Sequence, residues 1–189
     1  MLACVISVGV QTWGTDVVAL RRYWQMADDL GYARVTYGDG LWGWTHDGWT
    51  MLGALAGLTR RTRLGPAVTS CFEPSSHHPS FGERWSRLRT LLEREGRPSW
   101  EYRRSVELDV VLGLTDAEVE DELRRLCAAR AIERRDALLA AALVVIADAV
   151  AARIAQYAAA GATDLMLGFA DFPATRMVEI IAERVRPSG

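Results

Sequence analysis

The sequence predicts an α/β fold in which about six parallel strands alternate with helices. Three short apolar runs rich in β-branched residues occur at 4–10, 32–37 and 62–70. Such runs are typical of strands that are buried on both faces of a sheet. Amphipathic segments separate them, and the strands begin roughly every 28 residues, which is the size of one βα unit.

The first two helices have recognisable ends. Thr15 is a plausible N-cap for a helix that follows the first strand, and Gly31 can take the position just after its end. A second helix is predicted over 47–59, with Asp47 as its N-cap. Its apolar spacing places Trp49 on the face that packs against the core.

The βα pattern breaks after the third strand. Residues 71–80 are rich in Pro, Ser and His and predict a loop. Ser80 and Glu83 form a capping box for a helix over 81–95, and Gly96 follows its end.

The remainder returns to strands and helices. The strand predicted over 103–113 alternates, with Glu107 and Asp109 on one face, so that face should meet water. Thr115 and Glu118 make a capping box for the helix that follows it. The other expected elements are that helix to about 129, a continuation or a new helix over 132–141, a strand at 143–146, a helix at 147–160, a strand at 163–169 and a helix at 173–186.

Composition limits the class of protein. The chain has 189 residues, half of them hydrophobic, and a formal net charge of −2. One globular domain is therefore expected, with no bulk attraction to nucleic acid or an anionic membrane. Cys4, Cys71 and Cys127 show no disulfide or zinc spacing, so reduced thiols in a cytoplasmic protein are expected. The longest apolar run, in 137–147, is too short to span a bilayer, and the first residues do not resemble a signal peptide.

Gly38, Gly40 and Gly43 spell G-x-G-x-x-G after the second strand. In a dinucleotide-binding turn the last Gly opens a helix whose N–H groups hold pyrophosphate. Here "WTHDGW" follows, and the acidic residue expected about 20 residues later is missing. We therefore expect a tight loop at the carboxyl end of a strand, the end that carries the chemistry in parallel α/β folds.

Several longer segments resemble one family. They are "VGVQTW", "ADDLGYARV", "GWTMLGALAGLTRRTRLGPAVTS" and "AARIAQYAAAGATDLMLGFADFP", together with "EREGRPSWEYRRSVELDVVLGLTDAEVEDEL". They resemble the bacterial luciferase-like oxidoreductases, and in particular the actinobacterial branch that uses a deazaflavin coenzyme. All basic residues are Arg, and Lys and Asn are absent, which is typical of GC-rich bacterial genomes.

The resemblance implies a (β/α)₈ barrel that holds a deazaflavin coenzyme or FMN at the carboxyl ends of its strands. Hydride transfer or monooxygenation of a small organic substrate would follow. The strand-end residues that the resemblance assigns to the cofactor or substrate pocket are Gln11, Trp13, Asp39, Thr69, Ser70, Leu167 and Gly168.

The chain departs from the family at three places. Gly40 follows Asp39 where close relatives have Asp-His, and "VIAD" (145–148) stands where they have Gly-Thr-Pro or Gly-Ser-Pro. The middle of the barrel, with a phosphate-holding loop, is missing near 71–85. We therefore expect a partial, truncated TIM-barrel-like fold in one domain, 1–189, with βα units in 1–70 and 86–189.

Alternatives remain for the candidate residues. Trp42 and Trp44 either form a ligand wall or anchor a loop. Asp39 either orients a proton relay or bonds its own turn, and His46 is the other catalytic candidate. The residues His46, His77 and His78 do not have the spacing of a metal site, so none is expected. Arg60, Arg61 and Arg63 either meet a phosphate or form a solvated helix end.

The first functional interpretation is a luciferase-like oxidoreductase or monooxygenase using flavin or deazaflavin, impaired by the missing part of the barrel. The alternatives are a non-catalytic remnant that binds a small planar ligand or a partner, and a cofactor-free enzyme with a Trp-lined pocket. An incomplete barrel exposes two strand edges, expected at 62–70 and 103–111, so a homo-oligomer is expected.

Overall fold

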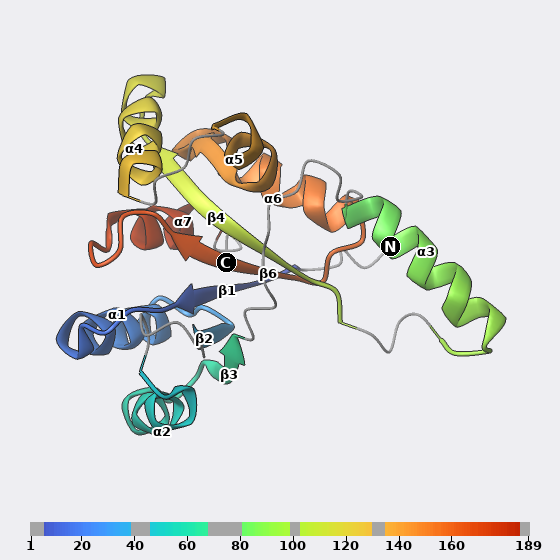
Figure 1. Ribbon diagram of the computed structural model, residues 1–189, viewed down its shortest axis with the longest axis horizontal. Helices are drawn as coiled ribbons and strands as arrows, with labels where there is room; N and C mark the ends of the chain where they lie inside the picture. Colours follow the sequence, from blue (N-terminus) through green and yellow to red (C-terminus); the bar gives the residue numbers. More distant parts are fainter. Residues whose placement is uncertain (1–5, 39–45, 68–80, 99–102, 130–134, 186–189) are drawn as a thin grey trace.

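The computed structural model describes residues 6–38, 46–67, 81–98, 103–129 and 135–185 (Figure 1). Strands and helices alternate along most of the chain. The elements are β1 (Ser7–Thr12), α1 (Val17–Asp29), β2 (Arg34–Gly38), α2 (Gly48–Leu58), β3 (Arg63–Ala67), α3 (Phe81–Arg94), β4 (Ser105–Gly113), α4 (Asp116–Ala129), α5 (Arg135–Ala141), β5 (Leu143–Ile146), the short 3₁₀ helix η2 (Ala147–Ala149), α6 (Val150–Ala159), β6 (Asp164–Phe169) and α7 (Arg176–Val185).

The described strands form one open, six-stranded parallel sheet in the order β3-β2-β1-β6-β4-β5. The expected α/β fold with six parallel strands is confirmed. The last strand of the chain, β6, lies between β1 and β4 and joins the N-terminal and C-terminal βα units into one sheet. All strands run the same way, so their carboxyl ends meet at one end of the sheet.

The prediction that the 103–111 strand forms an edge is confirmed for Ser105–Asp109, which pairs on one side only among the described strands, and is wrong from Val110 onward. β4 pairs with β6 over Ser105–Val110 and with β5 over Val110–Gly113. The outer strands among the described residues are β3, as expected, and β5. The pairing of the last part of β4 with β5 is a contact that the sequence of β4 itself does not encode.

One face of the sheet carries the main hydrophobic core. Alternate strand residues such as Val10, Val35, Leu165, Leu167 and Val110 are fully buried there. They pack against apolar side chains of α1, α2, α6 and α7. Because side chains alternate along a strand, the residues between them face the other side of the sheet.

A second, smaller core covers part of that other side. Val111 points away from its neighbours Val110 and Leu112 and packs with Leu123 and Leu126 of α4 and with apolar residues of α5. The α4 residues of this core and the α7 residues of the main core therefore lie on opposite faces of the sheet. Figure 1 shows both helices near the carboxyl end of β4. The sheet is therefore covered on both faces at its β4–β5 end.

The helix ends follow local rules with one exception. Asp16, not Thr15, caps α1 by accepting a hydrogen bond from the N–H of Ala19, which corrects the predicted cap by one residue. Asp47 caps α2 as predicted, accepting from the N–H of Thr50 at 2.7 Å. Gly31 has a φ of 81°, the left-handed conformation predicted for the residue after α1.

The last helix begins later than the sequence predicts. α7 starts at Arg176 and not at 173, because residues 170–173 form a turn. Ala174 donates its N–H to the carbonyl of Asp171, and Met177 donates its N–H to the Asp171 carboxylate. In the described parts of the chain no helix has the length and apolarity needed to cross a membrane.

Helix α3 stands apart from the rest of the molecule (Figure 1). Its contact with the body is through Trp85, whose ring lies against Gly161 and under the guanidinium of Arg104, 4.5 Å from the ring centre. Leu92 is also buried, whereas Leu88 and Leu91 are 43% and 48% exposed. We refer to α3 as the arm.

Candidate functional site

A row of residues crosses the sheet near the carboxyl ends of its strands. In register from β2 to β4 these are Thr36, Gln11, Gly168 and Asp109, which we call the polar row. Directly bonded neighbours in a parallel sheet point to the same face, here the one opposite the main core. The row therefore brings a hydroxyl, an amide and a carboxylate together from strands that are distant in sequence.

Trp13 covers the centre of the polar row. It directly follows β1, and its ring atom Cη2 would lie only 2.5 Å from a Cβ at Gly168. The Asp109 carboxylate oxygen Oδ1 is 3.5 Å from the same point. Only glycine allows this close approach, so Gly168 seats the half-buried indole between Gln11 and Asp109.

Thr36 holds an unusual hydroxyl. The residue is 6% exposed, and its Oγ1 has no hydrogen-bond partner among the described residues. A buried hydroxyl without a partner costs free energy, and such groups commonly mark a place where a ligand or water completes the bonding. Nothing in the sequence distinguishes Thr36, because a strand-like apolar run does not indicate which hydroxyl will lack a partner.

Buried hydrogen bonds fix the ends of β1 and β2 on the side of the sheet that carries the main core. The Trp24 indole N–H donates to Thr12 Oγ1 at 3.0 Å, and that hydroxyl donates to the Thr36 carbonyl at 2.8 Å. The Trp24 ring meets Tyr37 edge to face, with ring centres 6.0 Å apart. These contacts hold the backbone beneath the polar row in one position.

Tyr37 ties two strand-end loops together. Its hydroxyl donates to the Gly14 carbonyl at 2.6 Å and accepts the N–H of His46 at 2.9 Å. The His46 ring nitrogen Nε2 lies 3.0 Å from the Thr15 carbonyl, so that nitrogen carries the proton. His46, a catalytic candidate, is exposed. Its contacts join two loops on the helix side of the sheet.

The structure brings together some of the predicted pocket residues and not others. Gln11, Trp13 and Gly168 lie together at the polar row. Leu167 does not: it is fully buried in the main core, because it is one residue out of phase with Gly168. The other candidates fall outside the described residues, namely Asp39, Trp42, Trp44, Thr69 and Ser70.

The prediction that Trp49 packs in the core is wrong. Its side chain is 72% exposed, while Gly48, Met51, Leu52 and Leu55 form the buried face of α2. Trp49 lies at the margin of that face, in the first turn of the helix.

The arginines near β3 lie at the other end of the sheet. Arg60 and Arg61 precede β3 and donate their backbone N–H groups to the carboxylate of Asp28 at the end of α1. The Arg61 side chain forms an exposed ion pair with Asp29, 3.8 Å apart. These contacts favour the solvated helix end among the two interpretations of these arginines.

Burial and hydrogen bonding shift the pKa of Asp28 in opposite directions. Burial alone would raise it, but the N–H groups of Arg60, Thr62 and Arg61 and the charge of Arg61 bring the pKa of this carboxyl below its ordinary value. Asp28 therefore stays ionised and joins α1 to the start of β3.

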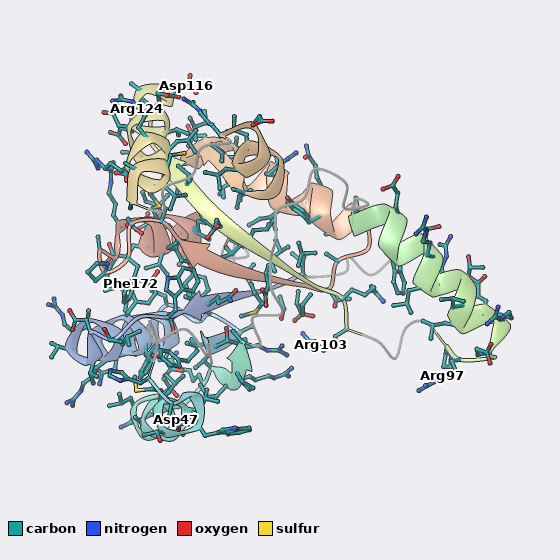
Figure 2. All side chains as sticks on the ribbon, viewed as in Figure 1. Asp47, Arg97, Arg103, Asp116, Arg124 and Phe172 are labelled. Atoms are coloured by element: carbon teal, nitrogen blue, oxygen red, sulfur yellow. The ribbon has the colours of Figure 1, made fainter. Side chains whose placement is uncertain are left out.

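A shallow groove of about 350 Å³ lies between α4 and the connection that follows β6. Asp171 lines it, and burial, opposed by the N–H of Met177, raises the pKa of this carboxyl above its ordinary value. Burial, with the charge of Asp171, also raises the pKa of Tyr23. Phe172, in the same connection, lies at the carboxyl end of the sheet, whereas Arg103, before β4, lies at the opposite end (Figure 2).

The part of the chain that the structure describes contains no cluster of three or more His, Cys, Asp or Glu side chains able to hold a metal ion. The polar row has a single carboxylate, Asp109, together with an amide and a hydroxyl. Its chemistry is therefore suited to hydrogen bonding with a polar organic ring.

Comparison with known proteins supports the resemblance found in the sequence. Residues 3–82 match the family model of the luciferase-like monooxygenases. No curated protein matches the chain. The fold is similar to that of an F420-dependent secondary alcohol dehydrogenase in complex with an F420-acetone adduct, with a TM-score of 0.70 at 10% identity, over 96% of this chain and 99% of that one.

A second similar structure is that of apo-MsnO8, with a TM-score of 0.61 at 14% identity, again over 96% of this chain and 99% of the other. At such low sequence identity these structures show a similarity of fold alone. They confirm the TIM-barrel-like arrangement of parallel strands and helices, while the family match concerns residues 3–82.

Proposed function

We propose that this chain, which carries the luciferase-like monooxygenase match in residues 3–82, is an oxidoreductase whose flavin or deazaflavin ring lies against the polar row. The observation that carries the proposal is the buried hydroxyl of Thr36, which lies beside Gln11 and has no hydrogen-bond partner in the described part of the chain. Both lie at the carboxyl ends of parallel strands, where α/β folds place their ligands.

The residues fit the ring of such a cofactor. One edge of the ring carries alternating carbonyl and N–H groups, and the Gln11 amide can both donate and accept while Thr36 supplies a further hydroxyl. Trp13 offers a flat apolar surface over Gly168. When bound, the cofactor would supply the hydride or electron-transfer chemistry, while these side chains orient its ring and exclude water from one side.

The residues fit the phosphate end of the cofactor less well. Phosphate is held by N–H groups at a strand-end loop or a helix N-terminus, usually with a basic side chain. The arginines of the β3 region, Arg60 and Arg61, lie at the opposite end of the sheet from Gly168. We therefore expect weak binding, held mainly through the ring.

The choice between the two cofactor types rests on one comparison. The dehydrogenase of similar fold is F420-dependent, which favours the deazaflavin coenzyme for this chain, with FMN as the second choice. A small organic substrate would approach the open face of the ring beyond Trp13.

Titration of the purified protein with FMN and with the deazaflavin coenzyme tests the proposal. Cofactor fluorescence should report binding with a Kd in the micromolar range or weaker. Gln11→Ala should weaken it by about five- to ten-fold, the value of one hydrogen bond. The exposed Gln25 of α1 provides the matched control, because Gln25→Ala makes the same change away from the sheet.

Two results would contradict the proposal. Binding that is identical in the Gln11 and Gln25 variants would place the ring elsewhere, and no binding of either cofactor would favour a cofactor-free protein. Binding without reduction by any tested alcohol or aldehyde would instead favour the non-catalytic remnant.

A further inference from the structure

The arm carries an apolar surface that its own chain does not cover. α3 has 14 residues, and isolated helices of this length are marginal in water. Trp85 and Leu92 are packed, but Leu88 and Leu91, on the same side of the helix, remain about half exposed. A projecting amphipathic helix of this kind is typically completed by a further packing partner.

A second exposed apolar surface lies at the carboxyl end of the sheet. Val17 and Val18 are 50% and 71% exposed in the first turn of α1, and Trp49 is 72% exposed in the first turn of α2. The link between Thr15 and His46 holds these two helix starts side by side. We define Val17, Val18 and Trp49, with the capping residues Asp16 and Asp47, as the rim patch.

The two surfaces are complementary in charge. Asp16 and Asp47 have no ion-pair partner among the described residues, and arginines of α1 follow only one turn later. The arm carries four arginines against two glutamates. Arg87, one residue before Leu88, has no ion-pair partner within the described ranges. An apolar strip flanked by positive charge thus matches one flanked by negative charge.

We propose that two copies of this chain exchange arms, with the arm of each packing on the rim patch of the other. The arm cannot reach the rim patch of its own chain: Arg97, just beyond α3, and Asp47 lie at distant places in Figure 2. A two-fold axis makes the contact twice and leaves neither surface open. The carboxylates of the rim patch disfavour an anionic lipid surface as the occupant.

The exchange has a consequence for the carboxyl end of the sheet. The rim patch starts at Asp16 and Asp47, directly after the two loops that hydrogen bonds to Tyr37 join. It therefore lies next to the carboxyl ends of β1 and β2. The arm of one copy would therefore lie at the carboxyl end of the other copy's sheet, on the side of α1 and α2, while the polar row faces the opposite side. This inference does not depend on the proposed cofactor, because its tests measure association.

Light scattering after size exclusion should show a dimer that dissociates on dilution. Leu88→Gln with Leu91→Gln on the arm should raise the dissociation constant about ten-fold or more, and so should Val18→Gln with Trp49→Gln on the rim patch. Leu139→Gln on α5 is the matched control, since Leu139 is equally exposed and lies on neither surface. Thermal unfolding checks that each variant is folded.

Mixing the arm variant with the rim variant distinguishes arm exchange from other dimers. The mixed pair keeps one complete arm-to-rim contact, so mixing should restore part of the dimer that each variant alone has lost. If two arms paired with each other instead, the rim variant alone would still form dimers and mixing would restore nothing.

Hydrogen exchange on the unmodified protein gives a second measurement that needs no variant. Residues 81–94, 16–21 and 47–52 should become more protected together as concentration rises. A monomer at high concentration, or a dimer that survives both sets of substitutions, would overturn the proposal. Capture of an unrelated protein by the arm, with the chain itself monomeric, would overturn it as well.

Discussion

The Trp13 indole lies directly on Gly168, so closely that its Cη2 atom would be 2.5 Å from an added Cβ. Gly168 is paired with Gln11 of β1 on one side and with Asp109 of β4 on the other. Because the strand is held on both sides, its backbone has little freedom to retreat. The position of the indole over the polar row therefore depends on the absence of a side chain at one residue.

Replacing Gly168 with Ala should consequently displace Trp13. We expect the free energy of unfolding to fall by about 1–3 kcal/mol, the usual cost of overpacking. Urea denaturation measures it. In a Trp13→Ala background the same replacement should cost much less, because the clash is gone.

Gly65→Ala is the matched control for Gly168→Ala. Gly65 occupies the same register row on β3, and an added Cβ meets no atom of the described residues within 4 Å. Its replacement should leave stability nearly unchanged. Equal losses at Gly65 and Gly168 would mean that the strand, and not the indole, is sensitive.

Two tryptophans should differ sharply in what they contribute to stability. Trp24 is 1% exposed and donates its indole N–H to Thr12, so Trp24→Ala should cost about 3–5 kcal/mol. Trp49 is 72% exposed, so Trp49→Ala should change stability by no more than about 0.5 kcal/mol. Denaturation of the two variants under conditions where the protein is monomeric makes the comparison, and similar losses would contradict the burial seen here.

The exposed position of Trp49, which was predicted to be buried, shows what helical periodicity cannot predict. The apolar spacing correctly predicted α2 and its Asp47 cap, because both are local properties. The width of the buried face depends on the neighbouring helix and sheet, and Trp49 falls just outside it. Leu167 illustrates the same limit in a strand, where a shift of one residue moves a side chain to the opposite face.

Long-range pairing accounts for most of what the sequence could not predict. Apolar runs located all six strands, but the insertion of β6 between β1 and β4 is set by contacts across the whole chain. The resemblance correctly brought Gln11, Trp13 and Gly168 to one end of the sheet. Asp109 was noted only as a residue on a water-facing side, and the Thr36 hydroxyl became visible only when its surroundings were known.

Asp28 should make stability depend on pH. Its carboxylate accepts the N–H groups of Arg60, Arg61 and Thr62 at 2.7–3.0 Å, so Asp28→Asn should cost about 1–3 kcal/mol at neutral pH. The folded pKa is depressed, and the contribution is therefore complete above the unfolded value of about 3.9 and is lost as the pH falls through the folded value.

The difference in unfolding free energy between wild type and Asp28→Asn should then narrow below about pH 4. Asp29→Asn is the control, since Asp29 is exposed and forms only a loose ion pair with Arg61. A gap between wild type and Asp28→Asn that stays constant from neutral to acid pH would show that the carboxylate charge does not matter.

Thr36 and Thr62 provide a test of the candidate site with a built-in control. Each has a buried hydroxyl without a partner among the described residues, one at the carboxyl end of β2 and the other before β3, at the amino end of the sheet. Valine has nearly the same shape as threonine and lacks the hydroxyl. Because each replacement removes an unsatisfied buried group, both should leave the free energy of unfolding unchanged or raise it by up to about 1 kcal/mol.

Only Thr36→Val should also weaken cofactor binding, by about five- to ten-fold, because of the two hydroxyls only that of Thr36 belongs to the polar row. Urea denaturation and titration with FMN and the deazaflavin coenzyme measure the two effects separately. If Thr36→Val lowers stability by about 2 kcal/mol and leaves binding unchanged, the hydroxyl has a structural role and the ring lies elsewhere.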